Sequence, residues 1–290
     1  MGRMGGSDSE RRVKVVCVTP VGPEGMGGID RLYFYMREHL KAAGIAPAVD
    51  IRYFAARGNA AGNRWLLAFP LRVLAFLWLL LTEPVDVVHL NHSTHGSAVR
   101  KWVLASLAKL FGKVVTCHFH GLVSDADYAA QPAWLGLYRA LLARADRIVI
   151  LGDVFAADLN RRFGVPLEKM VVIPNGIPDF ATDLAVPKPV KDTPLILFAG
   201  EVGPRKGAGL LLEALANLRQ KGQRWRCTIA GNGDIPEYRA MAQMLGLKDR
   251  VTFTGWIDAE RMHALMREAD IVVLPSRIEA LPLSLIEGAC

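Results

Sequence analysis

The chain has 290 residues, of which 51% are hydrophobic, and it carries a formal net charge of +7. This hydrophobic content excludes a disordered chain, and the ordinary numbers of glycine (27) and proline (16) exclude a fibrous or low-complexity protein. The length predicts about two domains. The positive charge favours anionic partners, such as nucleotide phosphates or an acidic membrane surface. No nucleic-acid module or aromatic-basic interleaving is present, so we expect no nucleic-acid partner.

The N-terminal segment and the cysteines bear on where the protein works. Residues 1–12 are polar and rich in glycine, without the apolar run of a secretory signal, and we expect a disordered tail. The four cysteines contain no C-x-x-C pair, so neither a zinc cage nor a disulfide framework is indicated. Reduced thiols are typical of a cytosolic protein, and we expect a cytoplasmic location.

Short apolar runs alternate with helical patterns in the first half of the chain. The runs are rich in β-branched residues and bounded by turns, which predicts buried strands. We expect strands at residues 13–19, 85–91, 113–118, 147–151 and 170–173, and helices at residues 30–43, 97–111 and 134–145. This order predicts a parallel sheet covered on both faces, and hence an α/β domain over residues 13–176.

One more apolar stretch, residues 66–81, is interrupted by Pro70 and Arg72. It is too short and too broken to span a bilayer, and we expect a buried helix. An interfacial helix that docks on a membrane is the alternative. The 21 basic and 16 acidic residues among residues 1–185 support it, because they give this half a charge of +5.

The texture changes at residues 177–193, which hold three prolines and few apolar pairs and are typical of a linker. The alternation then restarts over residues 194–290. We expect strands at residues 195–199, 226–230, 250–254 and 271–274, and helices at residues 207–220, 235–245 and 258–267. A doubly wound domain usually has more than four strands, so we expect this second domain to be incomplete at its C-terminal end.

The strongest functional signal lies in residues 275–287. Glu279 follows a predicted strand, and Glu287 comes eight residues later, about two turns into a predicted helix. Backbone amides around the start of that helix can hold phosphate or sugar oxygens. This stretch consists of Leu281, Pro282 and Leu283.

A second signal is the Gly-rich loop at residues 200–207, which enters a predicted helix. Its cations, Arg205 and Lys206, suit a diphosphate, although an ordinary loop with exposed charges is the alternative. A similar Gly-rich turn with Gly27 and Gly28 follows the first strand. Glycines let the backbone approach a ligand closely. The G-x-G-x-x-G fingerprint is absent because position 30 is Asp30, so a plain turn fits equally well.

Two histidines, His118 and His120, lie at the end of a predicted strand. Alternation along the strand would turn one ring inward and the other toward the ligand side. Their spacing also allows a metal, but no third ligand is evident, and we expect no metal.

Three further sites follow predicted strands or turns. Asn175 precedes a glycine and predicts a hinge turn, with a direct ligand contact as the alternative. Gly255 ends a strand on the ligand side. Trp256 follows it and either walls a nucleobase or packs in the core.

These motifs resemble the retaining glycosyltransferases of the GT-B fold, family four, over most of the chain. The pair formed by Glu279 and Glu287 matches the family's E-x7-E motif, with Ala280 where glycine is common, and Lys206 matches the family's loop lysine. The resemblance implies two Rossmann-like, doubly wound parallel-sheet domains facing a cleft. Residues 13–176 would bind the acceptor and residues 194–290 the nucleotide-sugar.

The resemblance also implies residue roles. Glu279 would contact the donor sugar and Glu287 the ribose, while Arg205 would replace the family arginine that is Glu201 here. His120 is the expected histidine near the donor sugar, with His118 as the alternative. The catalytic residues would be His120, Lys206 and Glu279, and the donor-binding residues Gly27, Gly28, Asn175, Arg205, Lys206, Gly255, Leu281, Pro282, Leu283 and Glu287.

The implied reaction moves a hexose from a nucleotide-diphosphate sugar to a hydroxyl of a sugar or lipid-linked acceptor. The configuration would be retained and no metal or other cofactor used, in polysaccharide or glycolipid assembly. The D-x-D sequence of Asp125 and Asp127 holds a metal-bound diphosphate in the other glycosyltransferase fold, but here we expect an exposed loop. The alternatives are a non-catalytic nucleotide-sugar-binding module and a sugar-nucleotide epimerase of the same fold. The inner face of the plasma membrane is an alternative partner surface.

Overall fold

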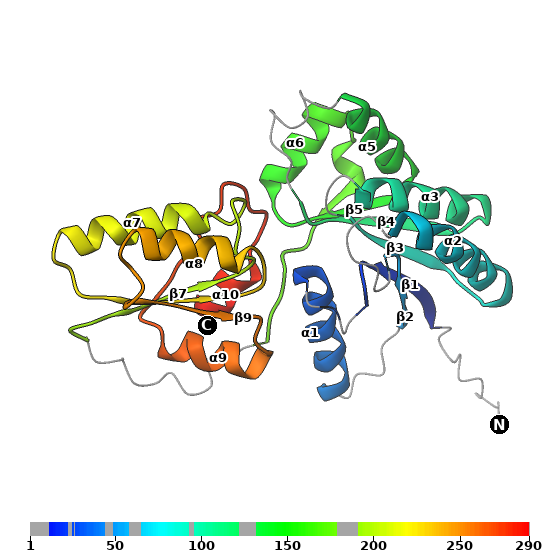
Figure 1. Ribbon diagram of the computed structural model, residues 1–290. Coiled ribbons are helices and arrows are strands. Elements are labelled where there is room, and N and C mark those ends of the chain that lie inside the picture. Colours follow the sequence, from blue (N-terminus) through cyan, green and yellow to red (C-terminus); the bar gives the residue numbers. More distant parts are fainter. Residues whose placement is uncertain are drawn as a thin grey trace. The chain divides into compact units, whose positions relative to one another are not determined.

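The computed structural model describes residues 12–22, 25, 27–43, 49–57, 65–92, 96–121, 132–178 and 191–289. The chain divides into two compact units, Met1–Gly176 and Ile177–Cys290, which we call unit 1 and unit 2. Each unit is an α/β structure built on its own sheet of parallel strands (Figure 1).

Unit 1 contains a six-stranded sheet in the order β2-β1-β3-β4-β5-β6. Its strands are β1 (Val13–Thr19), β2 (Val49–Ala55), β3 (Val87–His92), β4 (Val114–Phe119), β5 (Arg147–Ile150) and β6 (Met170–Val172). Its helices are α1 (Gly28–Ala42), α2 (Trp65–Thr82), α3 (Gly96–Leu110), α5 (Pro132–Arg144) and α6 (Asp153–Phe163). The strand order reverses between β1 and β3, and ligands of open α/β sheets bind at the carboxyl ends of strands beside such a reversal.

Two elements of unit 1, strand β2 and helix α6, are missing from the elements predicted from the sequence. In β2, Asp50 and Arg52 are exposed and alternate with less exposed apolar residues, because this edge strand has one face toward solvent. The continuous apolar run that marks a fully buried strand is therefore missing. Helix α6 follows β5 directly and keeps only Phe155 and Leu159 buried, so its apolar face is narrow.

The expectation of a buried helix at residues 66–81 is wrong. Helix α2 packs one side against the edge of the sheet, where the ring of Phe76 meets that of Phe54 on β2 at a centroid distance of 5.2 Å. Its opposite side stays exposed along the whole helix, with Leu67 and Trp78 exposed at 84% and 69%. The sequence could not show this, because α2 is apolar on every side and has no polar face to mark the solvent.

Unit 2 contains a four-stranded sheet in the order β10-β7-β8-β9. Its strands are β7 (Leu195–Ala199), β8 (Arg226–Ala230), β9 (Val251–Gly255) and β10 (Ile271–Val272). Its helices are α7 (Ala208–Gln220), α8 (Ile235–Met244), α9 (Ala259–Glu268) and α10 (Leu283–Ala289).

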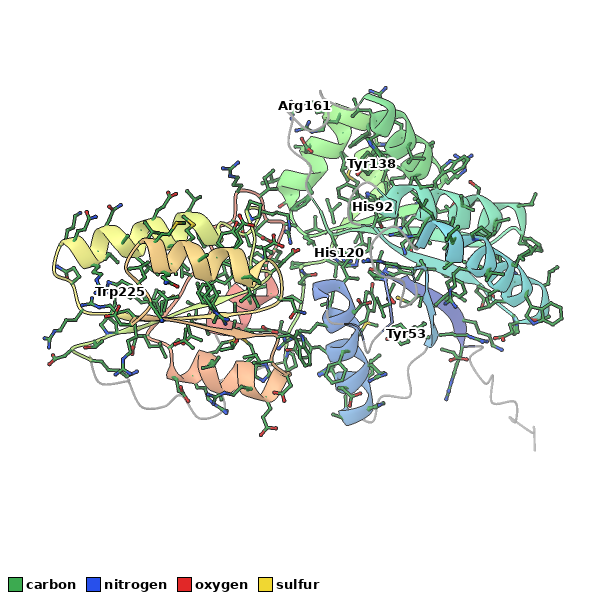
Figure 2. All side chains as sticks on the ribbon, in the orientation of Figure 1. Tyr53, His92, His120, Tyr138, Arg161 and Trp225 are labelled. Atoms are coloured by element: carbon green, nitrogen blue, oxygen red, sulfur yellow. The ribbon has the colours of Figure 1, made fainter. Side chains whose placement is uncertain are left out.

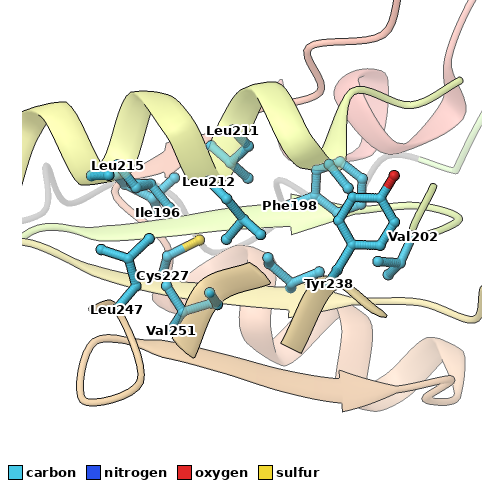
Figure 3. Packing of buried hydrophobic residues seen from close by; sticks show 14 of the residues in the cluster. Ile196, Phe198, Val202, Leu211, Leu212, Leu215, Cys227, Tyr238, Leu247 and Val251 are labelled. Carbon is cyan, nitrogen blue, oxygen red and sulfur yellow. The ribbon is translucent and has the colours of Figure 1, made fainter. Parts of the chain in front are cut away.

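Alternation along β7 divides the core of unit 2 between the two faces of its sheet. Ile196 and Phe198 pack with α7 and α8 in one cluster, in which Leu212 is fully buried (Figure 3). Leu197 and Ala199 pack on the other face with residues of α9. Both faces are therefore covered, and the loops at the strand ends carry the polar side chains.

Candidate functional site

Three loops of unit 2 meet at the carboxyl ends of its strands. They are residues 200–207 after β7, residues 231–234 after β8 and residues 273–282 after β10. The first two loops pair through a parallel bridge between Val202 and Gly233, in which the amide of Val202 donates to the carbonyl of Asn232 at 2.6 Å. A Cβ atom on Gly233 would lie 2.2 Å from the carbonyl oxygen of Val202, so this close approach requires glycine.

Gly207 joins the first loop to the third. Its backbone is left-handed, with φ of +75°, and a Cβ atom there would lie 1.9 Å from the carbonyl oxygen of Pro275. The amide of Arg277 also donates to the carbonyl of Arg205 at 3.3 Å. The backbone therefore fixes the loop that carries Lys206 against the segment that carries Glu279.

The structure brings Lys206 and Glu279 into direct contact. The ammonium of Lys206 donates to Oε1 of Glu279, and a guanidinium nitrogen of Arg205 lies 3.9 Å from the same oxygen. The side chain of Lys206 is only 16% exposed, so water screens this pair less than an ion pair on the open surface. Residues 73 positions apart in the sequence thus form one polar cluster at the end of the sheet.

Arg205 is held differently from Lys206. It donates to a carboxylate oxygen of Glu201 at 2.9 Å, and both side chains are well exposed. Such an exposed pair contributes little to stability. Glu201 stands where the resembling family has arginine, and we expected Arg205 to replace that arginine. Glu201 therefore compensates the charge of Arg205.

Glu287 lies in the last part of α10 and is buried, with 6% of its surface exposed. The helix packs closely on β10, because a Cβ atom on Gly288 would lie 2.8 Å from the side chain of Val272. Leu281, Pro282 and Leu283 are half-buried at the start of α10. The carbonyl of Pro282 accepts from the amides of Leu285 and Ile286. Glu287 thus lies on a short helix that packs against β10.

Gly255 ends β9 in a left-handed conformation, with φ of +74°, and its carbonyl accepts from the amide of Gly231 at 2.9 Å. It therefore supports the loop after β8. The next residue, Trp256, is half-exposed.

A second polar cluster lies in unit 1, at the carboxyl ends of β1, β3 and β4. The side-chain amide of Asn91 donates to the carbonyl of Val18 at 3.2 Å, and its Oδ1 lies 2.8 Å from Nε2 of His120. The backbone amide of His120 donates to the carbonyl of His92 at 2.9 Å. Figure 2 shows His92 and His120 among the side chains of this region.

The expected alternation of His118 and His120 is wrong. Residues two positions apart in an extended chain share one face, so the rings of His118, on β4, and His120, directly after it, lie on the same side, with centroids 3.8 Å apart. Burial lowers the pKa of His118 to about 3 and holds the pKa of His120 well below its ordinary value. Both rings are therefore neutral near pH 7.

The glycines after β1 are arranged around a buried carboxylate. Asp30 of α1 accepts from the amides of Val21 and Gly22 at 3.3 and 3.2 Å, and a Cβ atom on Gly25 would lie 2.3 Å from its Oδ2. A Cβ atom on Gly27 would lie 3.4 Å from this oxygen, and a Cβ atom on Gly28 would have no atom within 4 Å. Burial raises the pKa of the Asp30 carboxyl.

Sequence reasoning missed several buried polar residues of unit 1, among them Asp30, Asn91 and Lys101. Lys101 lies on α3, its ammonium is 3.5 Å from the carbonyl of Val18, and burial lowers its pKa to about 7. The sequence does indicate the burial of Lys101, because most residues around it in the predicted helix are apolar. Such a lysine is either exposed or a rare buried charge.

The remaining expected residues are Asn175, Asp125 and Asp127. Asn175 is half-buried near the end of unit 1, after β6. Asp125 and Asp127 lie outside the described residues. Within the described ranges, no group of three or more metal-ligating side chains could hold a metal ion, and no helix combines the length and hydropathy needed to span a bilayer.

Comparisons with known families match both units. Residues 9–176 match the family model of the glycosyl transferase 4-like domain, and residues 179–290 match that of the group 1 glycosyl transferases. The first match alone covers more than half of the chain.

Two curated proteins are similar to parts of the chain. The chain is 30% identical over 230 residues to D-inositol 3-phosphate glycosyltransferase of Xylanimonas cellulosilytica, which covers 71% of this chain and 54% of that protein. It is 35% identical over 97 residues to alpha-D-kanosaminyltransferase of Streptomyces kanamyceticus, covering 33% of this chain and 25% of that protein. The chain thus spans about half the length, or less, of these two relatives.

Among solved structures, sucrose-phosphate synthase of Thermosynechococcus elongatus is similar, with a TM-score of 0.71 and 22% identity over 96% of this chain and 79% of that one. This likeness shows the fold, which is GT-B with two Rossmann-like units. With a family model matching each unit, and the 4-like model alone covering more than half of the sequence, the chain belongs to the group 1 glycosyltransferases.

Proposed function

We propose that this chain is the sugar-transferring part of an enzyme that moves a hexose from a nucleotide-diphosphate sugar to an acceptor hydroxyl with retention. Unit 2 would bind the donor and unit 1 the acceptor, in polysaccharide or glycolipid assembly. The observation that carries the proposal is the contact between Lys206 and Glu279 at the carboxyl end of the unit 2 sheet. A cation for phosphate and a carboxylate for hydroxyls are the two groups that a sugar diphosphate requires.

Lys206 suits the diphosphate because it lies beside a helix N-terminus. Helix α7 begins two residues later, at Ala208, and runs for 13 residues, so its positive end supplements the ammonium. A departing diphosphate gains negative charge, and preorganised positive groups that meet this charge lower the barrier without a metal ion. The neighbouring Arg205 is less suited, since Glu201 compensates it.

Glu279 would orient the sugar. Its carboxylate now accepts from Lys206, and a bound diphosphate would compete for that ammonium. The carboxylate oxygens would then accept hydrogen bonds from sugar hydroxyls, which contributes positioning and not proton transfer. We further propose that Glu287, whose place is fixed by the close packing of α10, binds the ribose, and that His120 in unit 1 contributes near the donor sugar.

Hydrolysis of the donor, with water in place of the acceptor hydroxyl, is the test of this proposal. The chain would be incubated with uridine, guanosine and adenosine diphosphate sugars, and release of the nucleoside diphosphate and of sugar followed by NMR. UDP is the first nucleotide to test, because the structures of two proteins with this fold, TarM of S. aureus and pneumococcal GtfA, contain UDP. Slow hydrolysis to the sugar with retained anomeric configuration, unaffected by a chelator, is expected. Binding without turnover would instead indicate a binding module, and a changed sugar without release would indicate an epimerase.

We also propose that unit 1 docks on an anionic membrane surface, at the cytoplasmic face, through α2. Five large apolar side chains are exposed by 61–84% at spacings of four and three residues, which places them on one side of the helix. They are Leu67, Leu71, Leu74, Trp78 and Leu81. An exposed apolar stripe of this kind marks an interaction surface.

Positive charge lies beside this stripe. Residues of α2 and of the edge strand β2 line a groove of about 910 Å³, among them Arg72 and the ion pair of Arg52 with Glu83. Arg72 is held in place by two hydrogen bonds to the carbonyl of Ala55, at 2.9 and 2.6 Å, and by stacking over Phe54. Apolar residues next to the fixed guanidinium of Arg72 suit the boundary between lipid headgroups and acyl chains.

A further inference from the structure

The buried side chain of Asn91 has only one orientation that satisfies its neighbours. The carbonyl oxygen of Val18 can only accept a hydrogen bond, so the side-chain atom 3.2 Å from it must be the amide nitrogen of Asn91. The same nitrogen lies 3.5 Å from the sulfur of Cys17. The amide oxygen therefore points to His120, and the reverse orientation would place two carbonyl oxygens against each other.

This orientation decides which nitrogen of His120 carries the proton. The oxygen of Asn91 can only accept, and it lies 2.8 Å from Nε2 of His120. Nε2 must therefore donate, and in the neutral ring Nδ1 then keeps its lone pair. Because an amide oxygen does not take up a proton at ordinary pH, Asn91 cannot relay the Nε2 proton elsewhere.

The surroundings also keep the ring neutral. Burial lowers the pKa of His120 first, and the positive charges that could form on His118, His89, His92 and Lys101 lower it further. These groups come from β3, β4 and α3, so neighbours on several elements oppose an imidazolium. Asp30, the buried carboxylate among the described residues of unit 1, is itself engaged with the amides of the loop after β1.

We propose that Asn91 is a positioning residue that holds His120 as the Nε2–H tautomer, so that Nδ1 acts only as a hydrogen-bond acceptor. The proposal rests on the proposed sugar transfer, and in that reaction His120 accepts a hydrogen bond from a hydroxyl of the sugar or acceptor. A ring fixed in this way neither donates from Nδ1 nor takes a proton readily, which excludes general acid catalysis by His120.

The test is NMR of the histidine rings in the 290-residue protein labelled with ¹⁵N, without any nucleotide present. Long-range ¹H–¹⁵N correlations distinguish the two tautomers and the imidazolium, and the His120→Gln variant identifies the signals of His120. We expect a single Nε2–H pattern for His120 that does not change between about pH 6 and pH 8. An Nδ1–H pattern, an averaged pattern or an imidazolium in this range would overturn the proposal.

Two variants show whether Asn91 is responsible. Asn91→Ala removes the acceptor, and the ring nitrogens of His120 should shift toward averaged values as the second tautomer becomes populated. Thr116→Val is the matched control in the same buried layer, because Thr116 bonds Nδ1 of His89 at 2.7 Å and should change only the signals of His89. Unchanged His120 signals in folded Asn91→Ala would refute the role of Asn91. Since no donor is used, failure here leaves the proposed transfer reaction to be judged by its own assay.

Discussion

Replacing Lys101 with methionine should remove a pH-dependent contribution to the stability of unit 1. Lys101 is 1% exposed, and burial lowers its pKa from 10.5 to about 7. Between these two values the unfolded chain binds the proton and the folded chain does not, so stability rises with pH in this window. Each pH unit within it changes the free energy of unfolding by about 1.4 kcal/mol. Methionine has a similar length and no charge to bury.

The measurement is urea unfolding, followed by tryptophan fluorescence, at about pH 7 and about pH 8.5. The wild-type protein should gain about 2 kcal/mol over this interval relative to Lys101→Met. The interval stays below pH 9 because burial raises the pKa of Cys17 and of Cys117 from 9.0 to about 12, which reverses the slope at higher pH. Lys109→Met, an exposed lysine on the same helix, is the control and should follow the wild type. Equal pH dependence in Lys101→Met and the wild type would show that the buried amine does not titrate as described.

Two further predictions concern the loop before α7 and the surface of α2. Gly207→Ala should lower the thermal midpoint more than Gly222→Ala. Both glycines are left-handed, at a cost of about 1–2 kcal/mol for alanine, but only Gly207 would also meet a carbonyl oxygen at 1.9 Å. Similar midpoints for both variants would contradict the close approach of the two loops. Leu71→Glu should reduce co-sedimentation with anionic lipid vesicles several-fold, since a charge would enter the apolar stripe. Leu110→Glu, an equally exposed leucine at the end of α3, should not, and equal loss in both would refute docking through α2.

Strands in the middle of each sheet could be predicted from the sequence to within a residue or two. β7 is a continuous run of apolar residues between turns, and β1 contains the apolar run of residues 15–18, because helices cover both faces of their sheets. The edge strand β2 could not be predicted in this way, since Asp50 and Arg52 break its apolar run. The exposed side of α2 was also beyond prediction, because its composition does not differ from that of its buried side.

The candidate site could be predicted only where the motif lies in one segment or loop. Residues 275–287 and the loop with Lys206 were each identifiable, but the direct contact between Lys206 and Glu279 depends on the pairing of β10 with β7. The link from Asn91 to His120 joins residues 29 positions apart, one on β3 and the other directly after β4. Such contacts follow from sheet order, which alternating apolar runs do not determine.

Calorimetric titration with a nucleoside diphosphate, compared with the parent nucleoside, tests the donor site most directly. The wild-type chain should bind the diphosphate more tightly than the nucleoside, with or without a chelator. Lys206→Ala should weaken diphosphate binding about ten-fold to a hundred-fold, since a charge-assisted phosphate contact contributes about 1.5–3 kcal/mol, and should leave nucleoside binding unchanged. Lys221→Ala, at the far end of α7, is the control and should bind as the wild type does. Equal loss for both ligands in Lys206→Ala, or no preference of the wild type for the diphosphate, would contradict the donor site at the end of the unit 2 sheet.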